Sequence, residues 1–331
     1  MRVLVTGGAG FIGSHVVDRL LADGHAVDVL DNLSTGRRER VNPAARLVVC
    51  DLRSARLDDA IAAARPDAVA HLAAQAAVSR SVTDPRFDAS VNVFGTLGLL
   101  DAARRAAVRR VVYVSTGGAV YGDTDVLPTP EEHPTRPASP YGVSKLAGER
   151  YLECWAGLTG TPALTLRLAN IYGPRQDPAG EAGVVAIFSS RLLAGVECVV
   201  NGDGEQTRDY VYVGDVADAV ARALAHADAT GVVNIGTGVA TSVNDLYTRL
   251  ARLAGVTRPS RHGPARPGEQ RKSVLDASRA KALLGWVAAT PLDAGLAKTL
   301  EYFRERSHAN LQQATHGGGG LANPAPKETR A

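Results

Sequence analysis

The segment SPYGVSK, residues 139–145, sets a tyrosine four residues ahead of a lysine. Ser139 is a good helix N-cap and Pro140 suits the first helical position, so Tyr141 and Lys145 are expected on adjacent turns of one helix face. A tyrosine hydroxyl has an ordinary pKa of about 10, and an adjacent ammonium favours its ionised form. Such a pair can move a proton near neutral pH. At this spacing alone, a surface pair that stabilises a helix is the more common meaning.

A hydroxyl side chain precedes this pair in a second polar segment. Thr116 lies in VSTGGAVYG, at the end of a run of residues typical of a buried strand. Ligands of open α/β sheets bind at the carboxyl ends of the strands. The sequence therefore predicts that Thr116 and Tyr141 can hold one substrate oxygen between them.

A glycine-rich segment follows the first strand-like run. The residues TGGAGFIGSH contain Gly8, Gly10 and Gly13 in the spacing GxGxxG, between a predicted strand and a predicted helix. Glycines allow the backbone to approach a pyrophosphate, and the amides at the helix N-terminus favour that anion. The alternative is a tight turn with close helix packing and no ligand.

Acidic residues end the second and third strand-like runs. Asp31 stands about 20 residues after the glycines, where this motif requires a carboxylate that binds a ribose diol. Its charge opposes a 2′-phosphate, which favours NAD over NADP, although Arg37 and Arg38 keep the phosphorylated cofactor open. Asp51 can reach the adenine, or it can be a solvated acid at the end of a strand.

The composition is that of an ordinary globular protein. Of 331 residues, 45% are hydrophobic and 21% are charged. No apolar run has the length of a membrane span and no secretory signal pattern is present, so we expect a cytoplasmic protein without membrane contacts. A net charge of +3 gives no indication of nucleic-acid binding. Cys50, Cys154 and Cys198 lack CxxC spacing and the histidines form no HExxH motif, so neither a disulfide framework nor a metal site is expected.

The order of the predicted elements defines the fold class. The first half alternates β-branched runs with amphipathic segments, which indicates an α/β fold with a doubly wound parallel sheet of Rossmann type. The predicted strands cover residues 2–6, 26–30, 46–50, 67–71, 109–115 and 162–168. The predicted helices cover residues 11–23, 55–64, 86–107, 140–159, 183–194, 215–228, 242–254, 276–284 and 291–306.

These elements divide the chain into three parts. We expect an NAD-binding Rossmann domain over residues 1–169 and a smaller α+β lobe for the substrate over residues 170–306. The chain can cross back to the sheet from this lobe. Residues 307–331 contain GGGG and little apolar content, which is typical of a disordered tail.

Four segments together resemble the extended short-chain dehydrogenase/reductases that act on nucleotide sugars: TGGAGFIGSH, HLAAQAAVSRSV, STGGAVYG and SPYGVSKLAGE. The resemblance covers nearly the whole chain. It implies NAD as the cofactor and Thr116, Tyr141 and Lys145 as the catalytic residues. The NAD contacts that it implies are Gly7, Gly10, Phe11, Ile12, Asp31, Asn32, Ser34, Thr35, Gly36, Asp51, Leu52, Leu72, Ala73, Ala74, Gln75, Tyr141 and Lys145. The substrate contacts that it implies are Ser79, Thr116, Gly117, Tyr141, Asn170, Arg208, Arg266 and Glu269.

One segment separates the members of this family. Nucleotide-sugar 4,6-dehydratases carry an acidic pair after the threonine, in TDEVYG, whereas this chain has Gly117 and Gly118. The UDP-glucose 4-epimerases have no such pair. The resemblance therefore implies an NAD-dependent UDP-sugar 4-epimerase that inverts C4 through a transient 4-keto sugar.

The identity of the sugar stays open at this stage. Long-form glucose/galactose epimerases have a lysine in the segment where this chain offers Gln75 and Ala76, and Gly117 and Gly118 leave room for a larger or charged group on C6. UDP-glucose and UDP-galactose therefore fit as well as the uronates UDP-glucuronate and UDP-galacturonate.

Two alternative functions are compatible with the same fold. One is a nucleotide-sugar dehydratase or decarboxylase, and the other is a non-catalytic NAD-binding regulator, since fold does not determine function. The intact set of Thr116, Tyr141 and Lys145 speaks against the regulator. Members of the family are often homodimers through a four-helix contact, which here would use residues 86–107 and 140–159.

Overall fold

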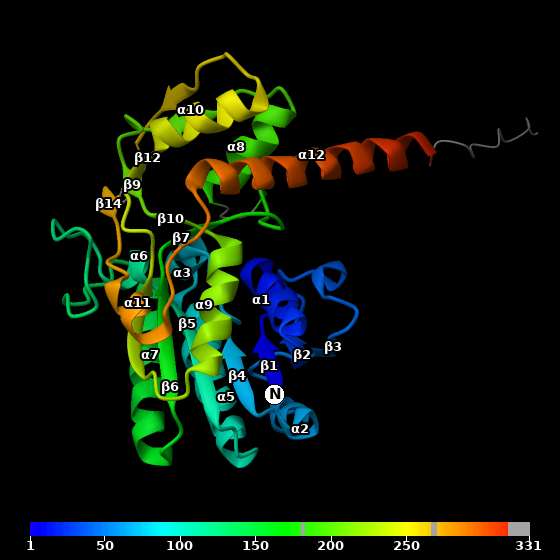
Figure 1. Ribbon diagram of the computed structural model, residues 1–331, viewed down its shortest axis with the longest axis vertical. Helices are drawn as coiled ribbons and strands as arrows, with labels where there is room; N and C mark the ends of the chain where they lie inside the picture. The colour runs from blue at the N-terminus through cyan, green and yellow to red at the C-terminus, as the bar shows by residue number, and fades with distance from the viewer. Residues whose placement is uncertain (180–182, 266–269, 317–331) are drawn as a thin grey trace, which may run out of the picture.

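The computed structural model of the chain describes residues 1–179, 183–265 and 270–316, with side chains described as far as Ser307. At its centre is a 7-stranded sheet in the order β11-β6-β5-β4-β1-β2-β3, and every neighbouring pair is parallel. The strands are β1 (Arg2–Thr6), β2 (Ala26–Asp31), β3 (Arg46–Val49), β4 (Ala68–His71), β5 (Arg110–Thr116), β6 (Ala163–Leu168) and β11 (Gly231–Ile235). Figure 1 shows helices on both faces of this sheet, so the predicted doubly wound fold is confirmed.

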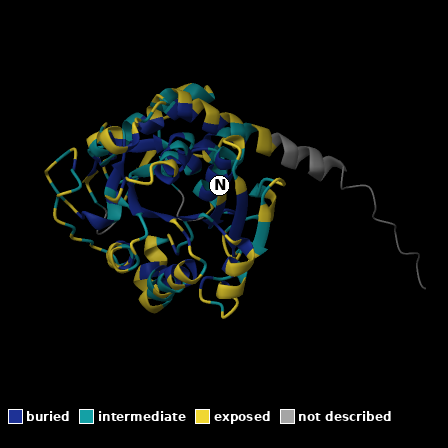
Figure 2. Cartoon of the chain, turned by 60° about the horizontal axis from the view of Figure 1, so that its bottom comes forward, coloured by how far each residue is buried: buried dark blue, intermediate teal, exposed yellow. Residues whose placement is uncertain are grey.

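The central strands are covered on both faces, as their residue types require. β4 and β6 are buried along their whole length, and β5 is buried up to its last residue. Figure 2 shows this as a dark blue centre surrounded by helices that are exposed on their outer sides. Continuous runs of valine, leucine and alanine are typical of parallel strands between two layers of helices.

Two separate hydrophobic cores fill the space between the sheet and its helices. On one face, Val16 and Val220 belong to the core of helices α1 (Phe11–Ala22) and α9 (Val213–Ala225). On the other face, the core is formed with helices α2 (Leu57–Ala64), α5 (Gly95–Arg105) and α7 (Pro140–Thr159), through residues that include Ile61, Leu99 and Trp155. The predicted helix over residues 140–159 is confirmed with both of its ends.

The predicted helix over residues 86–107 is present but is not regular. α4 (Pro85–Ala89), the π-helix η2 (Ser90–Phe94) and α5 follow one another without a break. A π-turn inserts one residue into the helical repeat and is often found at functional sites. Here the π-helix contains Asn92, a polar residue that is only 2% exposed.

The last strand of the sheet comes from the second half of the chain. β11 pairs with β6 in parallel, with Gly231 opposite Leu164 and Ile235 opposite Leu168. α9, which precedes β11, packs against α1. The chain therefore crosses back to the sheet after it has entered the lobe. The sequence pattern does not predict this strand, because the short run GVVNI has the length and apolar content of either a strand or a buried helical turn.

The lobe is built from short strand pairs and three longer helices. β7 (Asn170–Tyr172) pairs with β10 (Tyr210–Tyr212), and β8 (Val199–Asn201) pairs with β13 (Arg261–Gly263). A third group joins β9 (Thr207–Arg208) to β12 (Thr241–Ser242) and β14 (Lys272–Ser273). The helices are α8 (Val184–Leu193), α10 (Val243–Ala254) and α12 (Leu292–His316). The short helices of the chain are η1 (Arg38–Arg40), α3 (Val78–Thr83), α6 (Gly117–Val120) and α11 (Ser278–Leu284).

The expected tail from residue 307 overlaps an ordered element. The backbone of α12 is helical as far as His316, and Figure 1 shows this helix reaching from the lobe across the α1 side of the molecule. Residues 317–331 lie outside the described residues. No helix among the described residues is long and apolar enough to cross a membrane.

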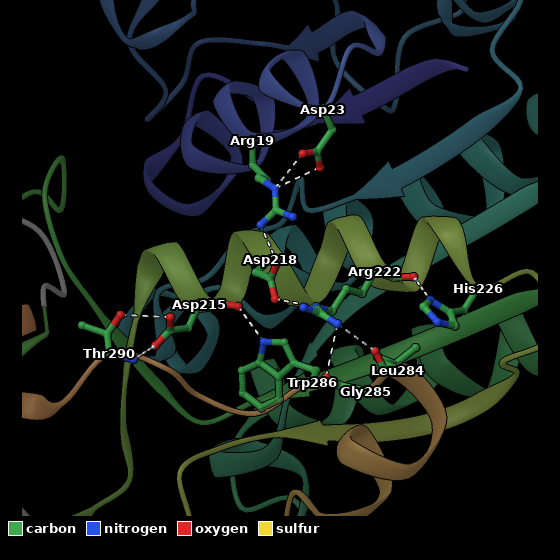
Figure 3. A network of polar contacts seen from close by, with 10 residues as sticks. All are labelled: Arg19, Asp23, Asp215, Asp218, Arg222, His226, Leu284, Gly285, Trp286 and Thr290. Atoms are coloured by element: carbon green, nitrogen blue, oxygen red, sulfur yellow. Dashed lines mark hydrogen bonds and ion pairs between the residues drawn. The ribbon is translucent and has the colours of Figure 1, made fainter.

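Polar contacts join α9 to α1 and to the segment that contains Trp286, as Figure 3 shows. The carboxylate of Asp218 on α9 accepts a hydrogen bond from Arg19 of α1 and another from Arg222 Nε, the latter at 2.7 Å. The Trp286 indole donates to Asp215 O at 2.9 Å. Helix α9 is thus bonded both to α1 and to the segment of Trp286, whose side chain belongs to the same hydrophobic core as these two helices.

Candidate active site

The carboxyl ends of neighbouring strands carry the residues predicted to bind the cofactor. Thr6 at the end of β1 is level with Leu30 of β2 and with His71 of β4. The segments that follow β1, β2, β3 and β4 therefore meet at one edge of the sheet, where ligands of doubly wound folds bind. These segments contain Gly7, Gly10, Phe11, Ile12, Asp31, Asn32, Ser34, Thr35, Gly36, Asp51, Leu52, Leu72, Ala73, Ala74 and Gln75.

The glycine turn has no room for side chains and leaves the start of α1 open. Gly7 has a φ of +71°, and a Cβ there would lie 2.7 Å from the Ala73 amide nitrogen. A Cβ on Gly13 would lie 2.1 Å from Gly7 O. Gly10 caps α1 without a side-chain hydrogen bond, and the first turn contains no acidic residue. The amides of that turn are therefore suited to an anion, and these residues fit the pyrophosphate of NAD.

Asp31 joins the glycine turn to the next loop. Its carboxylate is 7% exposed. Oδ2 accepts a hydrogen bond from Ala9 N at 3.0 Å, and Oδ1 accepts one from Leu33 N at 2.8 Å. A carboxylate has about four acceptor positions, so two remain for the hydroxyls of a ribose. This geometry fits the expected contact with the NAD ribose.

Asp51 at the end of β3 is an ion-paired acid. Arg53 Nε donates to its Oδ1 at 2.8 Å, and Asn32 Nδ2 donates to its Oδ2 at 2.8 Å. The hydrogen bonds from Arg53 hold the pKa of the Asp51 carboxyl well below its usual range. Of the two meanings that the sequence left open, the structure describes a strand-end acid that is engaged by Arg53, beside the loop expected to contact the cofactor.

Gln75 turns its side chain into the protein. Its Oε1 accepts from Ala77 N at 2.8 Å, and its Nε2 donates to Ala77 O at 2.8 Å and to Asp88 Oδ1 at 3.0 Å. Its backbone nitrogen donates to Asn92 Oδ1 at 2.8 Å. The polar groups of the Gln75 side chain thus make hydrogen bonds within the protein.

Helix α7 holds the predicted proton-transfer pair, and local sequence fixes its start. Ser139 Oγ accepts from Gly142 N at 3.1 Å, and Pro140 occupies the first turn, as the sequence predicts. The Tyr141 amide donates to Ser81 Oγ of α3 at 3.1 Å. Lys145 lies one turn further along and is 3% exposed.

Burial shifts both members of this pair toward their neutral forms. It raises the pKa of the Tyr141 phenol, and the charge of Asp88 raises it further. Burial also lowers the pKa of the Lys145 ammonium to about 7, although the charges of Glu149 and Asp88 oppose this change. In the chain alone Tyr141 is a neutral phenol. A further positive charge beside it is needed before it can act as a base near neutral pH.

Two aromatic side chains lie beneath Lys145. Its Nζ is 4.2 Å from the centroid of the Tyr113 ring, a distance at which the ring face attracts a cation. The His71 ring lies 5.4 Å from that of Tyr113 and is hydrogen bonded to Thr6 at 2.7 Å and to Thr96 at 3.0 Å. Burial lowers the pKa of His71 to about 3, so this ring is neutral and leaves Lys145 as the cation.

Thr116 ends β5 and caps α6, since its Oγ1 accepts from Ala119 N at 3.3 Å. The next residue, Gly117, is needed for packing. A Cβ at this position would lie 2.5 Å from Leu275 Cδ1, and Leu275 is 1% exposed. At Gly118 a Cβ would find its nearest neighbour at 3.5 Å. Of the two glycines expected to leave room for a substrate, Gly117 is therefore occupied by a neighbour and Gly118 is the more open.

The lobe supplies the remaining substrate residues of the prediction. Asn170 begins β7, and its backbone N–H donates to Asp209 O at 2.9 Å. Arg208 ends β9 and directly precedes Asp209. Asp209 is 0% exposed and accepts hydrogen bonds from the amides of Thr237 and Leu275, at 2.8 and 3.2 Å. The segments around Asn170 and Arg208 are thus joined through the backbone of Asp209, whose buried carboxylate in turn holds the segments of Thr237 and Leu275.

The other predicted substrate contacts are less fully described. Ser79 is an exposed residue of α3. Arg266 and Glu269 lie outside the described residues. Within the described part of the chain, no three His, Cys, Asp or Glu side chains are grouped so that they could hold a metal ion.

Sequence reasoning missed the buried side chains that surround Lys145. These are His71, Asp88, Tyr113, Glu149 and Arg167. A helical repeat was the one usable signal, because Glu149 follows Lys145 at the same interval by which Lys145 follows Tyr141. The other four come from strands or from another helix, and no local pattern links them to α7.

The chain was compared with protein families and with known proteins. Residues 3–236 match the model of the NAD dependent epimerase/dehydratase family. The UDP-glucose 4-epimerase of Mycolicibacterium smegmatis is 50% identical over 312 residues, which cover 93% of this chain and 100% of the relative. A putative UDP-glucose 4-epimerase of Methanocaldococcus jannaschii is 42% identical over 305 residues, which cover 92% of this chain and 99% of that protein.

Solved structures of similar proteins agree with the fold and with the cofactor. The UDP-glucose 4-epimerase of Thermotoga maritima, solved with UDP-glucose, superposes with a TM-score of 0.91 at 47% identity, covering 93% of this chain and 100% of the other. The Thermus thermophilus UDP-glucose 4-epimerase, solved in complex with NAD, has a TM-score of 0.87 at 45% identity and covers 92% and 99% of the two chains. The expectation of an NAD-dependent enzyme is thereby confirmed. By its motifs, its fold and these identities, the chain belongs to the NAD dependent epimerase/dehydratase family.

Proposed function

We propose that this protein is an NAD-dependent UDP-sugar 4-epimerase that interconverts UDP-glucose and UDP-galactose. The observation that carries this proposal is the placement of Tyr141 and Lys145 on α7, a helix that begins against the NAD edge of the sheet through the Ser81 contact at 3.1 Å. The relatives and the Thermotoga maritima structure named above support glucose as the sugar. Gly117 and Gly118 supply neither the acid nor the base that a dehydratase needs after oxidation.

The residues of the chain divide the work of the reaction. Tyr141 accepts the proton of the C4 hydroxyl and later returns it to the same oxygen. Lys145 stabilises the phenolate form of Tyr141 by its charge. Thr116 holds the C4 oxygen during both steps. NAD, held by the glycine turn and Asp31, would supply reversible hydride transfer at C4, so the overall reaction would consume no oxidant and release no proton.

The lobe is proposed to hold the nucleotide while the sugar turns. Arg208 suits a diphosphate because its planar guanidinium can bind two phosphate oxygens at once. Asn170 is tied to the same region through its backbone bond to Asp209 O at 2.9 Å. Firm binding of UDP and loose binding of the hexose allow the keto sugar to present either face to the cofactor. Arg266 and Glu269 complete this proposed set.

The reaction is tested by incubating the purified protein with UDP-glucose, UDP-galactose, UDP-glucuronate and UDP-galacturonate in separate samples and identifying products by NMR. Formation of the C4 epimer from both neutral sugars supports the proposal. Turnover of the uronates alone would contradict the choice of glucose and would indicate a UDP-uronate 4-epimerase. A 4-keto-6-deoxy product or a pentose would indicate a dehydratase or a decarboxylase, and tight NAD binding without any turnover would indicate a regulator. The variant Tyr141→Phe is the negative control.

We further propose that the protein is a homodimer through α4, α5 and α7. Val143, Tyr151 and Leu158 are 54%, 46% and 83% exposed on α7, and Phe94 is 68% exposed at the end of η2, directly before α5. Their spacing on α7 places the three residues on one side of the helix. A hollow of about 530 Å³ lies between α4 and α7 on the same side. A second copy of this surface would cover these apolar side chains.

The dimer is tested by light scattering coupled to gel filtration. Leu158→Glu should shift the mass from two chains to one, because it places a charge within the apolar contact. Val239→Glu is the matched control, since Val239 is also exposed, at 61%, but lies on the lobe. A wild-type protein with the mass of one chain would contradict the proposal. A cytoplasmic location is also proposed, because Cys50, Cys154 and Cys198 are free thiols, and it is tested by fractionation of the source cells.

A further inference from the structure

Asp88 is a buried carboxylate that the proposed reaction does not use. It lies on α4 and is 1% exposed. Its Oδ1 accepts hydrogen bonds from Gln75 Nε2 at 3.0 Å and from Asn92 Nδ2 at 3.1 Å. Both donors are neutral amides. Burying an ionised carboxylate with neutral partners alone is costly, so the structure must compensate this charge in another way.

The other buried charges nearby are not equally matched. Arg167 and Glu149 are both 3% exposed and form an ion pair with 2.6 Å between Nη2 and Oε2, so their charges compensate each other. Among the described residues, Lys145 makes no ion pair with a carboxylate, and Asp88 makes no ion pair with a cationic side chain. One cation and one anion therefore remain without a direct partner in this region. Each can serve as the counter-charge of the other, because charges in a low-dielectric interior interact more strongly than they do in water.

Asn92 fixes the position of Asp88 relative to α7. Its Nδ2 donates to Asp88 Oδ1 and also to Ser144 Oγ, the latter at 3.0 Å. Ser144 directly precedes Lys145. Gln75 completes the arrangement, because its backbone and side chain bond to Asn92 and Asp88. The carboxylate is thus held at one place with respect to both the cofactor loop and the catalytic helix.

We propose that Asp88 is a positioning residue of the catalytic centre: its buried carboxylate supplies the counter-charge that keeps Lys145 as an ammonium, and its bonds to Gln75 and Asn92 hold the loop after β4 in register with α7. This inference deepens the proposed epimerase function and depends on it for the meaning of Lys145. It assigns a role to a carboxylate that is buried beside the helix of Tyr141 and Lys145.

The electrostatic directions agree with this role. Burial lowers the pKa of Lys145 to about 7, and the charges of Glu149 and Asp88 both raise it. Burial raises the pKa of Tyr141, and the charge of Asp88 raises it further. Neutralising Asp88 should therefore lower the pKa of Lys145 and that of Tyr141. Because the active state needs the ammonium and the phenolate together, both limbs of a bell-shaped pH profile should move to lower pH.

The charge of Glu149 also raises the pKa of Lys145, but this carboxylate is already paired with Arg167. Tyr113 of β5 presents its ring face to the ammonium, and His71 of β4 is neutral because burial lowers its pKa to about 3. Glu149 itself is left unchanged in all variants considered below. On the outer side of α4, the Arg80 guanidinium of α3 lies 3.9 Å from the centroid of the Phe87 ring.

The first test reads Lys145 directly and requires no turnover. The chain contains five lysines, so protein grown with lysine labelled with carbon-13 at Cε gives five NMR signals, and Lys145→Arg identifies the signal of interest. Spectra are recorded over a pH series with NAD in excess. In Asp88→Asn the titration midpoint of Lys145 should move to lower pH. Asp84→Asn is the matched control, because Asp84 is exposed one turn earlier and caps α4, and an asparagine preserves that cap.

The second test measures kcat against pH with the UDP-sugar that the protein turns over. Asp88→Asn should shift both limbs to lower pH, so the variant loses more activity on the alkaline side than on the acid side. Asp88→Ser, which also removes the charge but changes the shape, should show the same shift, provided that circular dichroism finds both variants folded. An unmoved Lys145 midpoint would overturn the proposal, and so would a uniform loss of activity without a shift. If the midpoint moves but no UDP-sugar is converted, the proposed function fails while the charge relationship stands.

Discussion

The guanidinium of Arg167 and the carboxylate of Glu149 form an ion pair inside the protein, with Nη2 and Oε2 2.6 Å apart. Arg167 Nε adds a second bond to Oε1 at 3.1 Å, and Ser115 Oγ donates to the same oxygen at 2.5 Å. Arg167 also donates to the Tyr121 hydroxyl at 2.9 Å. These residues connect β6 with α7. Glu149 lies one helical turn after Lys145, and Ser115 is the residue before the last one of β5. Helix α7 is therefore joined to the sheet by charge as well as by apolar packing.

Removing one member of this pair should destabilise the fold strongly. Arg167→Met leaves the Glu149 carboxylate buried without its cation, which costs roughly 3–5 kcal/mol of unfolding free energy. The double variant Arg167→Met with Glu149→Leu removes both charges and should recover most of that loss. Urea unfolding followed by circular dichroism measures both. A loss below about 1 kcal/mol in the single variant would mean that water reaches the pair.

His71 should make the stability of the protein depend on pH. Its pKa in the folded state is about 3, below the ordinary value of the unfolded chain. The unfolded state therefore takes up a proton that the folded state refuses, and stability is lost as the pH falls from about 6.5 to about 3. One proton corresponds to a slope of about 1.4 kcal/mol per pH unit. His71→Asn should reduce this slope in urea unfolding series, whereas the exposed His226→Asn should leave it unchanged. Equal slopes for wild type and His71→Asn would contradict the buried neutral ring.

Tyr141→Phe should keep the fold and lose most of the turnover. The ring packs in the same place, but the oxygen that exchanges the proton is absent, so kcat should fall by about 10²–10⁴-fold. The circular dichroism spectrum and the melting temperature serve as controls for the fold. Tyr151→Phe removes a hydroxyl from the exposed side of the same helix, where Tyr151 is 46% exposed, and should have wild-type kcat. Full activity of Tyr141→Phe would remove this residue from the mechanism.

Asp31→Asn should weaken NAD binding while preserving the shape of the side chain. A hydrogen bond to a charged acceptor is stronger than one to an amide oxygen, so the Kd for NAD should rise roughly 10- to 100-fold. Isothermal titration calorimetry measures this change on protein stripped of cofactor. Asp28→Asn is the control on the same strand, because Asp28 bonds to Arg46 Nε at 2.8 Å. An unchanged Kd for Asp31→Asn would refute the ribose contact.

Local sequence determined a large part of the fold and of the site. The cap formed by Ser139 and Pro140, the helix that carries Tyr141 and Lys145, and the glycine turn all depend on residues within a few positions of one another. Their conformations follow from short-range hydrogen bonds and sterics, which a sequence expresses directly. The same holds for the alternation of strands and helices that predicts the doubly wound sheet.

Only the tertiary structure decided which distant residues meet. The return of β11 to β6, the contact of Gly117 with Leu275 and the pairing of Arg167 with Glu149 join segments that are far apart in the chain. The counter-charge of Lys145 belongs to the same class, because Asp88 lies on another helix and is brought near by packing. A single sequence carries no record of such pairs. The long-range packing also sets the dielectric surroundings, and these decide whether each buried group is charged.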